Sequence, residues 1–163
     1  LLTADGFSCV AGGAFVGEHS FSRTLGAGRP SGADVGEMDV FAEHVAAKLV
    51  AGDTAPVTVG GCDPIRPYYT PRDRHGDSIN ILKVKPKTDM TKCGGCGLCA
   101  ARCPMGSIDP ADVSRVNGVC IKCGACVKGC PTGAKYFDDP GYLYHKSELE
   151  EIYARPAKNE TFL

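Results

Sequence analysis

Eight of the ten cysteines lie in two closely spaced groups between residues 93 and 130. Each group has the spacing C-x2-C-x2-C-x3-C, and a proline follows each group, Pro104 after the first and Pro131 after the second. The members are Cys93, Cys96, Cys99 and Cys103 in the first group and Cys120, Cys123, Cys126 and Cys130 in the second. Thiols at this density indicate either disulfide bonds or bound metal.

The two groups form an internal duplication with an offset of 27 residues, since Gly97 matches Gly124 and Gly106 matches Gly133 in the same alignment. Three thiolates at i, i+3 and i+6 can bind three irons of one cubane, so the fourth iron must be reached from elsewhere. The spacing is that of bacterial ferredoxins, and residues 87–139 resemble a two-cluster [4Fe-4S] ferredoxin.

The resemblance implies two crossed ligand sets, in which the fourth cysteine of each group serves the other group's cluster. The set for cluster 1 would be Cys93, Cys96, Cys99 and Cys130. The set for cluster 2 would be Cys120, Cys123, Cys126 and Cys103. Neither site is then complete without both halves of the repeat, so cluster binding would hold the duplication together.

Other shared residues suit the same chemistry. We expect the glycines of the two loops to let backbone N–H groups point at sulfur, which tunes the reduction potential; these glycines are Gly94, Gly95, Gly97 and Gly124. We expect Pro104 and Pro131 each to open a short helix after the fourth cysteine. Tyr136 and Phe137 follow the second group, and we expect them to fill a small core rather than to serve a cluster directly.

Three alternatives compete with electron transfer. Structural zinc uses four-cysteine sites, but these are usually two separated C-x2-C pairs without the third cysteine at i+6. A disulfide framework is typical of small exported domains, whereas we expect a reducing compartment here. Bound clusters with a purely structural role form the third alternative.

The residues before the cysteines predict one strand and one helix. Residues 7–16 are an unbroken apolar run, typical of a strand buried on both faces of a parallel sheet. The segment 37–51 has apolar residues at Met38, Phe41, Val45 and Leu49, which predicts an amphipathic helix. We expect Asp34 and Glu37 to form a capping box at its start, and Gly52 to end it.

One strand and one helix do not make a domain, so we expect this part to be the remainder of a larger sheet. Residues 13–22 (GAFVGEHSFS), 27–30 (AGRP) and 34–52 resemble the last strand and helix of the flavodoxin-like domain in flavodoxin–ferredoxin fusion proteins of anaerobic prokaryotes. The resemblance implies a truncated flavodoxin-like domain and FMN in the intact parent only, because the phosphate loop of that fold is absent here. His19 and Ser20 are expected in an ordinary surface loop rather than at a flavin edge.

The expected fold class is α+β: a ferredoxin-like domain with pseudo-twofold symmetry, preceded by the strand and helix of a truncated α/β flavodoxin-like domain. The predicted ranges are 1–52 for that remnant, 53–86 for a proline-rich linker, 87–140 for the two-cluster domain, and 141–163 for a C-terminal helix and tail. In the last range we expect Ser147 and Glu150 to form a capping box. Outside the repeats, Cys9 is expected to be a small buried hydrophobe and Cys62 an incidental thiol in a turn.

The charge balance constrains the partners. The chain of 163 residues has 18 Lys and Arg against 19 Asp and Glu, so no basic field is available for nucleic acid, and no apolar run is long enough for a membrane span. Eight thiolates and two oxidised cores would shift the formal charge from -1 to about -5, which suits partners with basic docking patches.

The sequence therefore predicts an electron carrier with two [4Fe-4S] clusters, rather than an enzyme in its own right. It would exchange electrons with a flavin-type domain or another redox partner protein, in the cytoplasm of an anaerobe. Two alternatives remain open: the electron-input arm of an FMN-dependent oxidoreductase, and a zinc-binding structural or interaction module.

Overall fold

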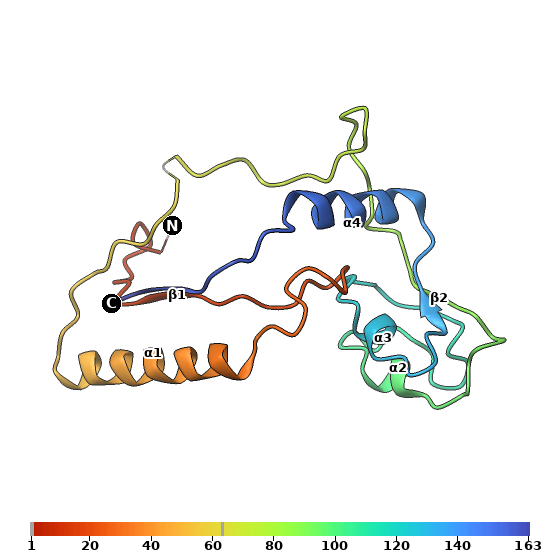
Figure 1. Ribbon diagram of the computed structural model, residues 1–163, viewed down its shortest axis with the longest axis horizontal. Helices are drawn as coiled ribbons and strands as arrows, with labels where there is room; N and C mark the ends of the chain where they lie inside the picture. The colour runs from red at the N-terminus through yellow and green to blue at the C-terminus, as the bar shows by residue number, and fades with distance from the viewer. Residues whose placement is uncertain (1, 63) are drawn as a thin grey trace. The chain divides into compact units, whose positions relative to one another are not determined.

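The structure is a computed structural model that describes residues 2–62 and 64–163. The described residues form four helices and two small two-stranded sheets, an α+β arrangement that confirms the expected class at this level (Figure 1). They group into two compact units. The first unit comprises 2–18, the described part of 26–68, and 155–163, and the second comprises 19–25 and 69–154.

The first unit is built on a sheet of two short strands and one long helix. Strand β1 (Gly12–Ala14) pairs antiparallel with β4 (Glu160–Phe162), so that Gly12 lies opposite Phe162. Helix α1 (Gly32–Val50) lies along this sheet, and the rings of Phe15 and Phe41 meet edge to face with centroids 5.8 Å apart (Figure 1).

The strand expected over residues 7–16 is largely absent. Only Gly12–Ala14 is a strand, its partner is antiparallel, and Phe7 is 63% exposed. A strand buried on both faces needs neighbours on both sides, whereas β1 has one partner strand and one helix. Within the described residues there is no parallel sheet, so the structure gives no support to the flavodoxin-like part of the expected fold.

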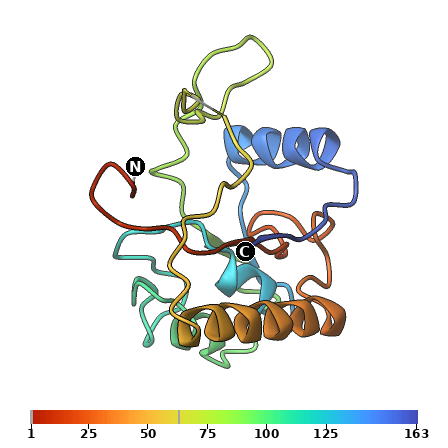
Figure 2. The same cartoon turned by 90° about the vertical axis from the view of Figure 1, so that its left-hand side faces the viewer.

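Helix α1 begins earlier than the sequence predicted. Ser31 is the N-cap: its hydroxyl accepts from the Asp34 N–H (3.3 Å), and the Asp34 carboxylate accepts from the Ser31 N–H (2.5 Å). This capping box lies three residues before the expected one at Asp34 and Glu37. Figure 2 shows α1 as one uninterrupted helix.

The predicted end of α1 is confirmed. Gly52 has φ 72°, a left-handed conformation that glycine adopts without penalty. Its N–H donates to the Leu49 carbonyl, and the Asp53 N–H donates to the Lys48 carbonyl, both at 3.0 Å. These two bonds form a Schellman motif.

Asp34 also joins the helix to the C-terminal segment. Its two carboxylate oxygens accept from Arg29 at 2.5 and 2.6 Å, and Oδ1 accepts from the Asn159 amide at 2.8 Å. The hydrogen bonds from Arg29, then from Ser31 and Asn159, hold the pKa of this carboxyl well below its usual range. The side chain is therefore an anion bonded on several sides.

The second unit contains the cysteine groups. Strand β2 (Lys87–Thr88) pairs antiparallel with β3 (Lys135–Tyr136), and two single-turn helices, α2 (Leu98–Ala101) and α3 (Ala125–Lys128), lie between them in the chain. The buried hydrophobic residues of this unit are Ile108, Ala134, Phe137 and Tyr142. This core is small.

Helix α4 (Pro140–Ile152) follows, and its start differs from the prediction. Asp139 is the N-cap, its carboxylate accepting from the Tyr142 N–H at 2.8 Å, and Pro140 occupies the first helical position, where a missing N–H costs nothing. The capping box expected at Ser147 is wrong, because Ser147 lies in mid-helix. Glu150 accepts instead from the hydroxyls of Ser22 (2.5 Å) and Thr24 (3.2 Å).

Residues 19–25 belong to the second unit, although their neighbours in the chain belong to the first. Phe21 contacts the rings of Tyr142 and His145, with centroids 4.7 and 6.0 Å away. The Ser20 carbonyl lies 2.3 Å from the point where a Cβ on Gly124 would stand, so Gly124 must be glycine. His19 and Ser20, expected in an ordinary surface loop, are half-buried, and the nearby Ser22 is fully buried.

The segment between α1 and β2 has no helix among its described residues, and its one bridge joins Arg72 to Ser78. Pro86 ends this segment, and β2 begins at the next residue. Among the helices of the described residues, none combines the length and the hydrophobicity that crossing a membrane requires.

Candidate metal centre

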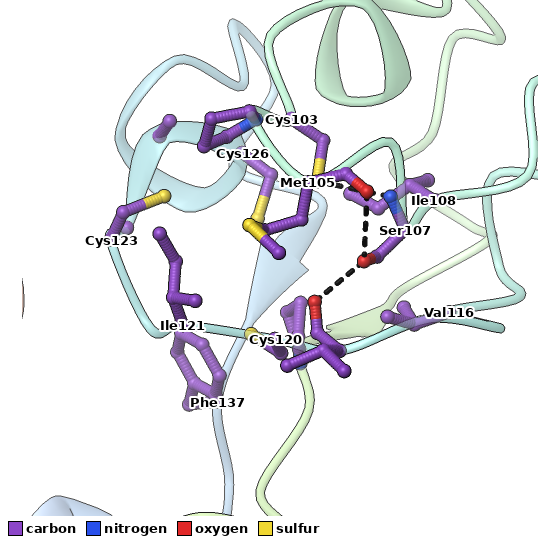
Figure 3. A pocket seen from close by; sticks show the side chains of 15 residues that line it. Cys103, Met105, Ser107, Ile108, Val116, Cys120, Ile121, Cys123, Cys126 and Phe137 are labelled. Atoms are coloured by element: carbon purple, nitrogen blue, oxygen red, sulfur yellow. Dashed lines mark hydrogen bonds between the residues drawn. The ribbon is translucent and has the colours of Figure 1, made fainter.

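Two cavities in the second unit are each lined by four cysteines. The first cysteine cavity is lined by Cys93, Cys96, Cys99 and Cys130. The second cysteine cavity is lined by Cys103, Cys120, Cys123 and Cys126. Figure 3 shows the second, with the sulfurs of Cys103, Cys123 and Cys126 turned toward shared space. The structure thus brings together the same two sets that the resemblance implied, and their role as ligands stays a prediction.

The short helices explain why the sets cross. Cys99 lies in α2 and lines the first cavity, whereas Cys103, just past the end of α2, lines the second. Cys126 in α3 and Cys130 beyond it reverse this pattern. Each helix therefore separates the third cysteine of its group from the fourth.

Glycines and prolines shape both loops in the same way. Gly97 and Gly124 are the N-caps of α2 and α3, with φ 72° and 74°. The sequence predicted that Pro104 and Pro131 each open a short helix, and this is wrong. Each proline instead follows the fourth cysteine of its group in a tight turn. The turns are closed by Gly106 N–H to the Cys103 carbonyl (3.0 Å) and Gly133 N–H to the Cys130 carbonyl (3.3 Å). Proline is favoured at the second position of such turns, because its φ is already set.

The turns present backbone N–H groups to sulfur. The Ser107 N–H donates to Cys103 Sγ at 3.4 Å (Figure 3), and the Ala134 N–H donates to Cys130 Sγ at 3.2 Å. The two bonds are equivalent in the repeat. The Cys130 sulfur also lies 3.6 Å from the Thr132 hydroxyl, in a hydrogen bond that has no hydroxyl counterpart at Met105.

These contacts affect the thiol pKa values. Burial raises the pKa of Cys130, but hydrogen bonds from Thr132 and from backbone N–H groups outweigh it and lower the pKa to about 7. The pKa of Cys103 is lowered in the same manner, backbone N–H groups of Ser107 and its neighbours overcoming the effect of burial. Burial, with some repulsion from Cys120 and Cys123, raises the pKa of Cys126 to about 11. Metal ligation uses the thiolate, so the lowered pKa values of Cys103 and Cys130 favour their binding to metal.

The cavities fit a cluster chemically. Beside the thiols, the second cavity is lined by buried apolar side chains, Ile108 and Phe137 among them, which limit solvent access. In the part of the chain that the structure describes, no three His, Cys, Asp or Glu side chains converge as the ligands of one metal ion. A [4Fe-4S] cluster asks for a wider arrangement, because each thiolate binds its own iron.

Two buried lysines lie beside the cysteines, and the sequence reading missed both. Lys135 is 3% exposed and lines the first cavity, with its ammonium donating to the Val113 carbonyl at 2.5 Å. Lys122 is 6% exposed and stands between Cys120 and Cys123. Aligning the two repeats would have singled them out, because the second half has a lysine at each of two positions where the first half has an uncharged residue, Ile108 opposite Lys135 and Gly95 opposite Lys122.

The remaining predicted residues are placed as follows. Phe137 is buried, lines the second cavity and stacks on Tyr142 with ring centroids 4.3 Å apart, so it fills the core and faces the cysteines at once. Tyr136 is 38% exposed, so the expectation that it fills the core is wrong, because in β3 it points to the opposite side from the buried Lys135. Cys62 is exposed, and Cys9 is half-buried in the first unit rather than fully buried.

Comparison with known proteins agrees with this geometry. The family model for a 4Fe-4S dicluster domain matches residues 92–135. A search of curated proteins and a search of solved structures found no match to the chain. The matched residues include all eight cysteines of the two groups, so this part of the chain has the cysteines to bind two [4Fe-4S] clusters.

Proposed function

Because residues 92–135 form a 4Fe-4S dicluster domain, we propose that the chain is an electron carrier that relays single electrons between redox partner proteins through its two clusters. The observation that carries the proposal is the pair of cysteine cavities, each completed by a cysteine from the other half of the repeat. Two neighbouring four-thiol sites suit a relay, since one can accept an electron while the other donates.

The proposed ligands of cluster 1 are Cys93, Cys96, Cys99 and Cys130, and those of cluster 2 are Cys103, Cys120, Cys123 and Cys126. The clusters would supply the one-electron chemistry. The chain's own residues supply ligation, an apolar lining around the second cavity, and N–H groups aimed at sulfur. The Ser107 and Ala134 N–H groups donate to ligand sulfurs and stabilise negative charge on them. Because reduction adds negative charge, these bonds would favour the reduced state of each cluster.

The partner proteins are part of the proposal only as a class. A flavin-type domain is one hypothesis for the partner, and it depends on the sequence resemblance of residues 13–52 alone. The role as electron-input arm of an FMN-dependent oxidoreductase depends on that same resemblance.

The first test is the content of iron, acid-labile sulfide and zinc per chain, in protein purified without oxygen. We expect about 8 iron and 8 sulfide. About 2 zinc and little sulfide, after a full attempt at cluster reconstitution, would replace the proposal with a zinc framework.

Paired cysteine variants test the crossed ligand sets. With crossed ligands, Cys93→Ala and Cys130→Ala remove the same cluster, so the double variant should keep about 4 iron, the content of one cubane. Cys93→Ala with Cys103→Ala should lose both clusters. Uncrossed ligands would reverse the two results. Cys62→Ser, which alters an exposed cysteine outside the repeats, is the control and should keep the full iron content.

A further inference from the structure

The two halves of the repeat share a left-handed backbone conformation at one position but have different residues there. Lys122 has φ 56°, and among the described residues it is the one non-glycine residue with positive φ. Its counterpart in the first half, Gly95, has φ 69°. The loop therefore demands a left-handed residue, and lysine occupies this position despite the steric penalty that glycine avoids. A residue kept in a strained conformation points to a use for its side chain.

The side chain of Lys122 reaches a defined place. Its ammonium donates to the Leu82 carbonyl and, at 2.8 Å, to the carbonyl of Cys120. The neighbours Ile121 and Cys123 both line the second cysteine cavity. The positive charge is thus held, almost out of solvent, against the loop that carries two of the four thiols of that cavity.

The first cavity has its own cation at a different position. Lys135 lines that cavity, whereas its counterpart in the repeat, Ile108, is apolar and lines the second. Lys135 is therefore the cation of the first cavity, and Lys122 is the cation attached to the ligand loop of the second.

We propose that Lys122 sets the reduction potential of the cluster in the second cysteine cavity, and with it the difference in potential between the two clusters. The inference rests on the proposed function, because it needs both clusters in place. Reduction adds one negative charge to the cluster. A nearby buried ammonium stabilises that charge more than water would, since screening inside a protein is weak. Lys122 thereby makes the second cluster easier to reduce than it would be with its cysteines and burial alone.

The test compares Lys122→Gln with Lys122→Arg and Lys135→Gln in the full chain, by a redox titration of both clusters followed by electron paramagnetic resonance. Cys130→Ala, which keeps only the second cluster under the proposed ligand sets, assigns the two midpoints. We expect Lys122→Gln to decrease the reduced-to-oxidised ratio of the second cluster about tenfold at a fixed potential. This corresponds to a lowering of its midpoint potential by about 59 mV for a one-electron couple. The midpoint potential of the first cluster should shift less.

The comparison variants separate charge from structure. Lys122→Arg keeps the charge and should keep the wild-type potential of the second cluster. Lys135→Gln should lower the reduction potential of the first cluster at least as much as that of the second. It should therefore not reproduce the effect of Lys122→Gln, which lowers the second potential relative to the first. If Lys122→Gln leaves both potentials unchanged at full iron and sulfide content, or if arginine fails to restore the potential, the inference is wrong while the proposed function stands. If wild-type protein lacks about 8 iron and 8 sulfide, the proposed function itself fails.

Discussion

At the scale of single residues, Asp34 shows how charge and hydrogen bonds take the place of apolar packing in the first unit. Its carboxylate accepts from Arg29, Ser31 and Asn159, and so ties the start of α1 to the segment that leads into β4. These bonds need the ionised form. Their contribution to stability therefore depends on pH.

The sign of that dependence follows from the lowered pKa of Asp34. A carboxyl whose pKa is lower in the folded state stabilises the fold above its unfolded pKa, about 3.9, and the stabilisation is lost as pH falls through the folded value. We expect amide hydrogen exchange in α1, corrected for intrinsic rates, to rise as the pH is lowered from 5 to 3. Asp34→Asn should raise exchange at pH 7 and flatten the pH dependence. Asp39→Asn, at an exposed position on the same helix, is the control and should change neither.

At the scale of elements, the start of α4 illustrates competition between local signals. The segment offers two possible beginnings, Asp139-Pro140 and Ser147 with Glu150, and the chain uses the first. Proline at the first helical position restricts the backbone in favour of a helix, and the Asp139 carboxylate satisfies the Tyr142 N–H. Glu150 is then free to accept from Ser22 and Thr24.

Removing the cap should weaken this helix. We expect Asp139→Ala to lower the free energy of unfolding of the second unit by about 1 kcal/mol, the usual value of an N-cap. Ser147→Ala, at an exposed mid-helix position, should have no destabilising effect, because alanine is the better helix former. Chemical denaturation of the cluster-loaded protein measures both. Equal losses in the two variants would contradict the observed start of α4.

At the scale of the whole molecule, the apolar core is unevenly distributed. All of the described hydrophobic residues that are buried lie in the second unit, and they are few: Ile108, Ala134, Phe137 and Tyr142. A core of this size stabilises little on its own, so bound clusters are expected to supply much of the folding free energy of that unit. The first unit depends instead on α1, its caps and the Asp34 contacts.

Cluster removal should therefore act on one unit. We expect treatment with a chelator under oxidising conditions to abolish hydrogen-exchange protection in α3, β3 and α4, while α1 keeps most of its protection. Peptide-resolved exchange by mass spectrometry makes the comparison within one sample. Retained protection throughout the second unit after complete loss of iron would show that its folding is independent of the clusters.

Much of the metal centre could be predicted from the sequence, because the duplication and the ligand spacing are local. The crossed grouping came from resemblance to ferredoxins, and the cavities of the structure show the same grouping. The role of residues 7–16 could not be predicted, because β1 pairs with a strand nearly 150 residues away and its sequence does not specify that partner. The end of α1 at Gly52 was predictable, whereas its start depended on whether Ser31 or Asp34 served as the cap.

The contribution of residues 19–25 limits how this protein can be dissected. A fragment of residues 69–154 would keep every cysteine of the two groups, yet it would leave Tyr142, His145 and Gly124 without the Phe21 ring and the Ser20 carbonyl that cover them. The cluster-binding part is therefore not a cassette that can be moved into another protein by two cuts in the gene. A transplant would need this seven-residue loop as well, supplied from a position some fifty residues earlier in the chain.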